Sequence, residues 1–362
     1  MTLDIKRFVI DHAHKALCEQ AEDGSMPPGC NGPYGHPELP LRNTAHWLVL
    51  WAFCFKWTGE KDFINAANKA LSYVLLPENR PQGFNWYQRN QRGRDQCNGT
   101  IGVAWIIETL CHATAILGSK RAAKIAFEVY EQHRFDSKNS LWNRLEVDGQ
   151  ILSIDQTFNH QLWLAASASR LAQLGSKLAK SDVSRFLDNI DTHFEIYRNG
   201  LIQHRISLKW YDRLFRPGTP FHFAYLQYDK LKKRSFKSLD VKKRDHGYHA
   251  FNMHAFSTLK RNFPNHSFWE NEKFLKALDY ARSEKHGQNV SPPNPYSYEY
   301  NPVGFEMAYT ISVFDPKSKQ EANRWLQRQI GELGPDYGLQ ACDSNTAKAR
   351  VYEVVEYVDL YE

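Results

Sequence analysis

One pattern of polar and apolar positions recurs along the chain. In its clearest copy, Asp155, Asn159 and His160 precede an almost uncharged apolar run at residues 162–168. A helix that is apolar on every side is a buried helix, and the polar residues fall in its first turns, where free backbone N–H groups also lie. The pattern therefore predicts a buried helix with a polar site at its N-terminal end.

Similar apolar segments begin near residues 42, 98, 155, 249, 301 and 350. Each is partnered by an amphipathic segment, at residues 5–18, 61–75, 121–130, 181–190, 271–280 and 320–326. A spacing of about 50 to 57 residues is typical of a repeat architecture. Six buried helices inside six amphipathic ones predict an all-α fold, an (α/α)6 toroid that forms a single domain over residues 1–362. An open solenoid is the alternative, but it exposes one helix layer along a groove.

The turns between partner helices are short, whereas the loops that return to the next apolar helix are long and are expected on one face. One contains a β-hairpin signal around Asp148-Gly149, with strands at 141–147 and 150–153. An insertion at about 200–247 opens with a strand-like segment and ends in a basic run at 230–244. The run is interpreted first as a solvated surface loop and second as a weak contact for an anionic surface. No recognised nucleic-acid motif accompanies it.

Composition is that of a soluble globular protein, with 42% hydrophobic and 24% charged residues. The 14% aromatic content indicates a large core first and stacking platforms for sugar rings second. The N-terminus lacks the features of a signal peptide, and no apolar run approaches the roughly 20 residues of a membrane span. Six scattered cysteines and the absence of metal-ligand spacing predict neither disulfides nor a metal or other cofactor, and favour a cytoplasmic location.

These features together resemble the six-hairpin glycosidase superfamily, which includes unsaturated uronyl hydrolases, polysaccharide lyases and N-acylglucosamine 2-epimerase-like sugar isomerases. More narrowly, four runs are similar to AglQ-type proteins of glycosylation and polysaccharide gene clusters, at residues 31–35, 42–47, 157–163 and 301–306. The resemblance implies a sugar substrate held at the mouth of the toroid. It does not identify the reaction, because chemistry within the superfamily is diverse.

Hydrolysis of a glycosidic bond needs a carboxylic acid with a raised pKa and a second group that directs water. Asp155 is the first candidate for the acid, and the resemblance to uronyl hydrolases is compatible with that role. The alternative is that Asp155 caps its helix, and a helix N-terminus lowers the pKa of a carboxylate. Asp95 and Asp245 occupy matching positions, so either could be the second carboxylate or another cap. Glu306 is a further candidate because an unpaired buried charge is costly.

Histidines offer a competing mechanism, since a converging pair could remove and return a proton on a sugar carbon. His160 and His249 are the catalytic candidates of this kind, although a single histidine in such a place is more often a hydrogen-bonded core residue. Tyr248 or Tyr300 could alternatively carry out β-elimination on a uronic acid. Arg42 suits a substrate carboxylate or a structural ion pair. The remaining candidate substrate-binding residues are Asn43, His46, Trp47, Asn98, Asn159, Asn252, Tyr352 and Glu353.

The sequence thus predicts a carbohydrate-active enzyme, with hydrolysis of a uronic acid-containing oligosaccharide or glycoconjugate as the leading reaction. A sugar epimerase or a polysaccharide lyase is the second hypothesis. A non-catalytic glycan-binding or assembly protein is the third.

Overall fold

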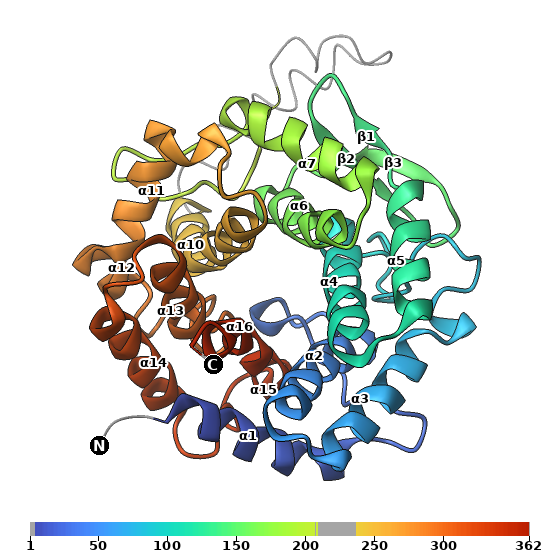
Figure 1. Cartoon of the computed structure of the whole chain (residues 1–362). Helices are drawn as coiled ribbons and strands as arrows, with labels where there is room; N and C mark the ends of the chain where they lie inside the picture. The colour runs from blue at the N-terminus through green and yellow to red at the C-terminus, as the bar shows by residue number, and fades with distance from the viewer. Residues whose placement is uncertain (1–3, 207, 209–236, 362) are drawn as a thin grey trace.

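The inner helices form a closed ring around a common axis (Figure 1). The computed structural model describes residues 4–206, 208 and 237–361. Five of the inner helices are α2 (Leu41–Thr58), α4 (Gly99–Leu117), α6 (Phe158–Gln173), α10 (Lys237–Asn262) and α13 (Val303–Phe314). The sixth position is taken by α15 (Ser344–Ala349), η6 (Arg350–Val354) and α16 (Val355–Asp359). Successive inner helices pack against one another, and η6 closes the ring by contacting both α13 and α2.

The outer layer consists of amphipathic helices, each with one exposed face (Figure 1). They are α1 (Ile5–Ala16), α3 (Lys61–Val74), α5 (Lys120–Gln132), α7 (Lys177–Asn189), α11 (Glu272–Arg282), the short α12 (Glu284–Asn289) and α14 (Lys319–Leu333). Short 3-10 turns connect them at η1 (Leu17–Glu19), η2 (Gly32–Tyr34), η3 (Pro77–Asn79), η4 (Ile190–Thr192) and η5 (Ser267–Glu270). The predicted (α/α)6 toroid is confirmed.

The apolar inner helices supply most of the core. In α4, every residue from Gly99 to Ala113 is buried. By length and composition alone, α4 is the one described helix that could cross a membrane. The expectation that no apolar run approaches that length is therefore corrected. In this fold α4 is apolar because it is buried by its packing against α2, α5 and α6.

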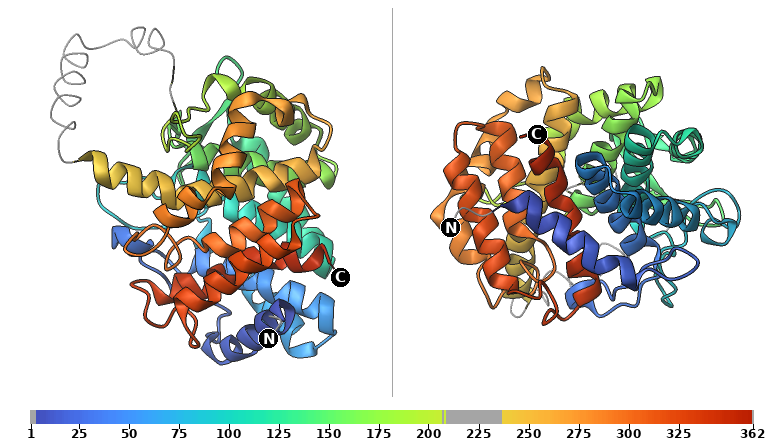
Figure 2. Two further views of the ribbon diagram at one scale, coloured as in Figure 1. Left: turned by 90° about the vertical axis from the view of Figure 1, so that its left-hand side faces the viewer. Right: turned by 60° about the horizontal axis from the view of Figure 1, so that its bottom comes forward.

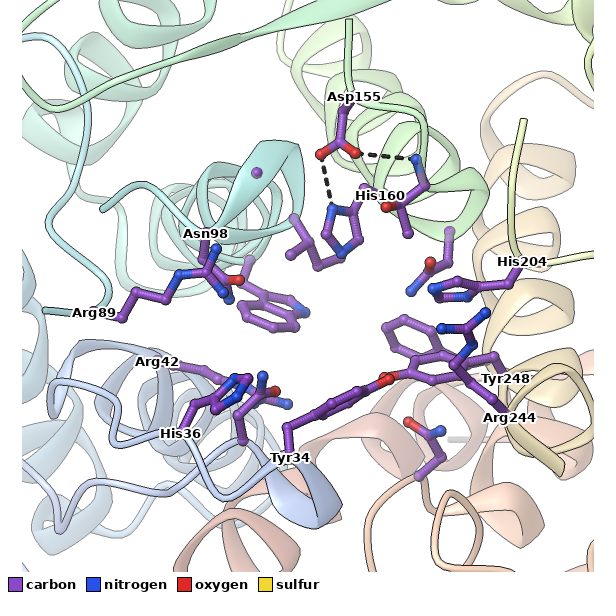
Figure 3. A pocket seen from close by; sticks show the side chains of 18 of the residues that line it. Tyr34, His36, Arg42, Arg89, Asn98, Asp155, His160, His204, Arg244 and Tyr248 are labelled. Carbon is purple, nitrogen blue, oxygen red and sulfur yellow. Dashed lines mark hydrogen bonds and ion pairs between the residues drawn. The ribbon is translucent and has the colours of Figure 1, made fainter. Parts of the chain in front are cut away.

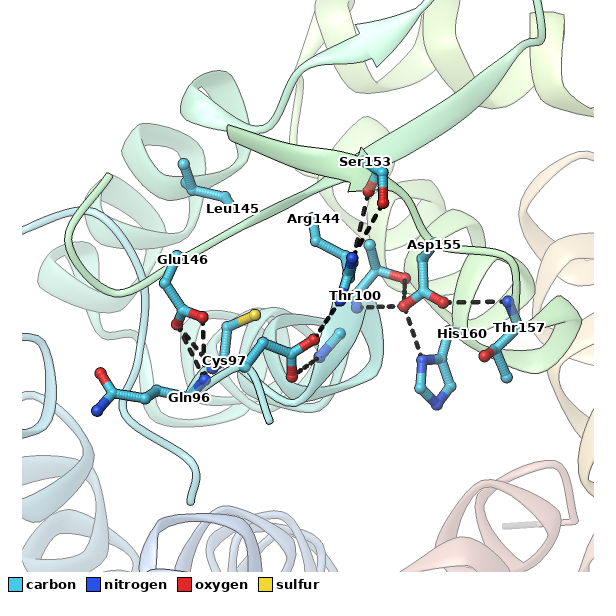
Figure 4. A network of polar contacts seen from close by, with 12 residues as sticks. Gln96, Cys97, Thr100, Arg144, Leu145, Glu146, Ser153, Asp155, Thr157 and His160 are labelled. Carbon is cyan, nitrogen blue, oxygen red and sulfur yellow. Dashed lines mark hydrogen bonds and ion pairs between the residues drawn. The ribbon is translucent and has the colours of Figure 1, made fainter. Parts of the chain in front are cut away.

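A small antiparallel sheet lies in the loop before α6. Its strands are β1 (Phe135–Asp136), β2 (Leu141–Leu145) and β3 (Ile151–Ile154), in the order β1-β2-β3. The predicted hairpin is therefore confirmed. The end of β3 at Ile154 places Asp155 next to the first turn of α4 (Figure 4).

Part of the predicted basic insertion lies outside the described residues, namely 207 and 209–236. The end of the basic run departs from the predicted loop, because Lys242 and Lys243 are exposed residues of α10. This helix begins at Lys237, about a dozen residues before the predicted start near 249. Figure 2 shows α10 continuing past the body of the ring at this end. Periodicity alone missed these turns because their charges hide the apolar stripe.

Candidate active site

The N-terminal ends of the inner helices and the loops that precede them surround a cavity of about 430 Å³ (Figure 3). Eight of the residues singled out from the sequence line it: Arg42, Asp95, Asn98, Asp155, Asn159, His160, Tyr248 and Tyr300. The expected convergence of polar helix starts on one space is therefore found for these residues. Their individual roles remain predictions.

Eight other candidates do not line the cavity: Asn43, His46, Trp47, His249, Asn252, Glu306, Tyr352 and Glu353. All are at most 4% exposed. The sequence places them in the right helical turn, but a helix presents only part of each turn to the axis. These residues are buried outside the cavity lining, and their contact with substrate stays a prediction.

His46 and Trp47 illustrate how the ring uses such residues. His46 stacks on Tyr352 with 4.3 Å between ring centroids, and Trp47 stacks on His12 of α1 at 5.1 Å. Tyr352 donates a hydrogen bond to Glu108 at 3.1 Å. These residues pack helices against each other. Asn43 likewise bonds to the Pro27 carbonyl at 2.9 Å, while Asn252 is buried within α10.

His249 is a structural residue in this arrangement. Its Nδ1 accepts a hydrogen bond from the Ile202 N–H at 3.2 Å, and its Nε2 lies 3.0 Å from the Ala277 carbonyl oxygen, to which it donates. Both ring nitrogens are therefore occupied. Burial lowers the pKa of His249 to about 3, which keeps the ring neutral. The histidine joins α11 to the strand-like segment that carries His204 into the cavity.

Glu306 belongs to a buried ion cluster beneath the cavity. Arg350 lies 2.6 Å from Glu353 through Nε and 3.2 Å from Glu306 through Nη2. Burial, followed by the charge of Glu353, raises the pKa of Glu306 well above its ordinary value, although Arg350 opposes the shift. Glu306 is therefore the member of the cluster that keeps its proton, and it is buried and does not line the cavity.

Glu306→Gln is expected to preserve turnover and to change the free energy of unfolding by less than about 1 kcal/mol, because glutamine imitates a protonated carboxyl. Glu306→Ala is expected to cost about 3 kcal/mol, because it opens a void and removes a partner from buried Arg350. Urea unfolding measures both values. Loss of activity in a folded Glu306→Gln protein would restore the catalytic role predicted from the sequence.

Asp155 and His160 form a dyad at the wall of the cavity (Figures 3 and 4). His160 Nδ1 lies 2.8 Å from Asp155 Oδ2, and the same oxygen accepts the Thr100 N–H at 2.9 Å. Asp155 Oδ1 accepts the Thr157 N–H at 3.0 Å. The His160 side chain is 22% exposed, and the far side of its ring faces the open space (Figure 3). The dyad therefore presents His160 Nε2 to a ligand.

The surroundings of Asp155 argue against a general acid. Burial raises its pKa, but the charge and hydrogen bond of His160 and the two backbone N–H donors outweigh this and hold the pKa far below 3.8. The helix-capping alternative is closer to the structure, although Asp155 does not cap its own helix, whose N-cap is Thr157. Instead it accepts from the first turn of α4. An ionised Asp155 accepts the hydrogen bond from His160 Nδ1 and thereby fixes the orientation of the ring.

The dyad depends on the close approach of α4. Asn98 and Gly99 both have left-handed backbones, with φ of 58° and 63°, which turns the Thr100 N–H toward Asp155. A Cβ at Gly99 would collide with Asp155 Oδ2 and lie 2.6 Å from His160 Nδ1. Glycine is therefore required at this position by both conformation and space.

Gly99→Ala is expected to lower turnover about 100-fold, since it displaces both members of the dyad. Gly118→Ala is the matched control. Gly118 caps the other end of α4 with a φ of 70°, and a Cβ there meets nothing within 4 Å. The control shares the backbone strain of about 1–2 kcal/mol and should keep its activity. Equal losses in the two variants would show that strain, and not displacement of the dyad, is responsible.

Asp95 lines the cavity as a carboxylate held by two arginines. Arg89 Nη2 lies 2.5 Å from Oδ1 and Arg144 Nη1 lies 2.6 Å from Oδ2. Although burial raises the pKa of Asp95, the two arginines lower it below its ordinary value. Like Asp155, it stays ionised at neutral pH. Arg42 is also paired, with Glu38 at 3.0 Å, and its guanidinium lies 4.1 Å from the centre of the Trp105 ring.

His204 faces the same space as His160, a feature that sequence reasoning missed. The Phe158 N–H donates to the His204 carbonyl at 2.8 Å, and the Ile206 N–H donates to the Gln156 carbonyl at 3.0 Å. The segment that carries His204 is thereby pinned to the start of α6, which carries His160. Burial, followed by the charges of Arg244, His160 and Arg205, lowers the pKa of His204 well below 6.5. The only signal in the sequence is a short strand-like run in an insertion.

Other lining residues were also missed. Tyr34 comes from the first of the four recognised runs, and its hydroxyl lies 3.3 Å from that of Tyr248. Trp105 gives the cavity an aromatic wall, while Arg94, Arg205, Arg244 and Arg350 add positive charge. The sequence shows these residue types but not their convergence, because they come from separate loops and helices.

The ring and its polar mouth define a protein of the (α/α)6 toroid class. At 12% identity, the cellobiose 2-epimerase of Spirochaeta thermophila superposes with a TM-score of 0.63 over 98% of each chain. The α-1,6-mannanase of Salegentibacter sp. HEL1_6 gives a TM-score of 0.58 at 9% identity, over 99% of each chain. Identities this low establish a common fold. Sugar epimerases and glycoside hydrolases therefore share this scaffold with the chain.

A closer relative identifies the family. Archaeal glycosylation protein Q of Haloferax volcanii is 37% identical over 364 aligned residues, which cover 97% of this chain and 96% of the relative. No family model matches the sequence. The chain belongs to the family of archaeal glycosylation protein Q, as the resemblance predicted.

Proposed function

We propose that the protein is an enzyme that transfers a proton at a carbon atom of an acidic sugar, with His160 and His204 as the two proton carriers. Such a transfer inverts or isomerises the carbon without breaking a glycosidic bond. The observation that carries the proposal is the pair of imidazoles facing one space, one oriented by Asp155 and the other kept neutral. His204 then acts as the base, and His160, which Asp155 holds in place with its Nε2 toward the cavity, acts as the acid.

An acidic substrate is supported by the charge of the cavity wall. Seven arginines line the cavity, against two carboxylates, Asp95 and Asp155. Guanidinium groups recognise carboxylates with two parallel hydrogen bonds. A hexuronic acid within an oligosaccharide or glycoconjugate fits this environment, while Trp105 offers a stacking face for a sugar ring.

Hydrolysis of a uronic acid-containing glycan is the second candidate, favoured by the presence of both Asp95 and Asp155 at the cavity. It requires a carboxylic acid that still holds a proton when the substrate binds. Both carboxylates have lowered pKa values and fixed partners, so neither meets this requirement.

The cytoplasmic location expected from the sequence also remains a prediction.

Incubating the protein with uronate-containing oligosaccharides in deuterated water tests the proposal. Deuterium on a sugar carbon without cleavage, observed by NMR, is the expected result. Oxygen from water in a cleaved product would indicate a hydrolase, and an unsaturated uronate that absorbs in the ultraviolet would indicate a lyase. Binding without any turnover would indicate a glycan-binding protein. Each of these three outcomes would overturn the proposed reaction.

A further inference from the structure

Three of the cavity arginines, Arg94, Arg205 and Arg244, have no ion-pair partner among the described residues. By contrast, Arg42, Arg89, Arg144 and Arg350 are held by carboxylates. The unpaired arginines are therefore the ones available to a ligand. Arg205 is the next residue after His204, and Arg244 comes from α10 beside the His204 ring (Figure 3).

Arg244 is prepared for an anion. Its Nε is buried and has no hydrogen-bond partner among the residues that the structure describes. A buried donor without a partner is unfavourable, and a bound carboxylate would satisfy it. Across the cavity, the carboxylate of Asp155 already has three partners: His160 and the Thr100 N–H at Oδ2, and the Thr157 N–H at Oδ1. A negatively charged ligand group is therefore expected beside His204 and Arg244 and not beside Asp155.

We infer that Arg205 and Arg244 form a carboxylate subsite next to His204, so that the exchanged proton is on the carbon bonded to that carboxylate, C5 of a hexuronate. This inference rests on the proposed proton transfer and specifies its substrate. A C–H group beside a carboxylate is only weakly acidic, because removing its proton places a second negative charge on the carboxylate oxygens. Two guanidinium groups at those oxygens stabilise that charge where it develops.

The step balances without an oxidant or a reductant. The neutral imidazole of His204 takes the proton from C5, and the electron pair of the C–H bond moves into the C5–C6 bond to give an enediolate. The imidazolium of His160 then donates a proton to C5 from the other face, and the electron pair returns. His204 ends protonated and His160 neutral, and exchange with solvent restores both.

The first test compares substrates in deuterated water with the full chain. Disaccharides that end in glucuronate, galacturonate or mannuronate are compared with their neutral hexose counterparts and with glucose 1-phosphate. Deuterium at C5 of a uronate, and none in the neutral or phosphorylated sugars, is expected. Equal exchange in a neutral sugar or a sugar phosphate would overturn the carboxylate subsite but leave the proton transfer intact. Exchange in none of them would overturn the proposed function itself.

The second test changes the arginines. R244Q is expected to lower kcat/KM for uronate exchange about 100-fold, the loss typical of removing one partner of a buried charged contact. R205Q is expected to lower it about 10-fold, because Arg205 is exposed and its charge is screened by solvent. R244K, which keeps the charge, should recover part of the loss. K243Q is the matched control, because Lys243 is exposed on the same helix and does not line the cavity.

Folding failure does not obscure the result. Arg205 is exposed, so R205Q removes a charge without opening the core. Circular dichroism and the unfolding midpoint verify each variant. If folded R205Q and R244Q both remain within about threefold of the wild-type kcat/KM, the subsite is overturned.

Discussion

His160→Ala is expected to lower kcat for proton exchange about 1000-fold. The variant removes the imidazole whose Nε2 faces the cavity, and a positioned general acid contributes about 10² to 10⁴ in rate. Asp155 would keep its bonds to the Thr100 and Thr157 N–H groups, so the fold is expected to survive. Steady-state kinetics by NMR measure the effect. Retention of more than a tenth of the wild-type kcat would exclude His160 as a proton carrier.

Two further variants sharpen this test. Asp155→Asn leaves the side chain in place but removes the charge that orients His160, and it is expected to lower kcat by about 10² or more. His14→Ala is the control, since His14 is an exposed histidine of α1, pairing with Glu60 at 3.1 Å. Its activity should equal that of the wild type. A loss in Asp155→Asn without any change in the ionisation of His160, followed by NMR, would show that Asp155 acts only as a structural bridge.

The fold could be predicted because its determinants are periodic. Each inner helix is apolar all around, and each outer helix has one charged face, so that the two layers are visible in the sequence. The predicted starts near 42, 98 and 301 lie within two residues of the observed starts at Leu41, Gly99 and Val303. The predicted start of α10 was wrong because the first turns of this helix carry many charged residues. The sixth inner position also differs, since it is divided into α15, η6 and α16.

The candidate site was predicted only in part, for a geometric reason. The first turn of a helix points some side chains to the axis and others to neighbouring helices. His160 and His249 illustrate this, because both begin apolar segments, yet one faces the cavity and the other is bonded on both ring nitrogens. A sequence pattern identifies the helical turn in which a residue lies. It does not identify whether the side chain points to the axis of the ring or to a neighbouring helix. His204 and Arg205 could not be predicted, since their position depends on pairing with the start of α6.

Acidification below about pH 6.5 is expected to destabilise the protein strongly, because many histidines are buried in the neutral form. Burial lowers the pKa values of six of them to about 3 or 4, against 6.5 for the exposed side chain: His12, His112, His133, His246, His249 and His254. The pKa values of three others, His46, His204 and His286, also lie well below 6.5 because of burial. Between these values the unfolded chain binds protons that the folded chain does not. Stability is therefore constant above pH 6.5 and is lost as the pH falls.

The size of this effect follows from the number of histidines. Each contributes about 1 kcal/mol at one pH unit below 6.5, so the nine together contribute on the order of 10 kcal/mol between pH 7.5 and 5.5. Urea unfolding at a series of pH values measures the slope. His133→Gln is expected to reduce the slope by about one ninth, since His133 is buried away from the cavity, with its Nδ1 bonded to the Val129 carbonyl at 2.8 Å. An unfolding free energy that stays flat over this range would mean that these histidines already carry protons in the folded ring.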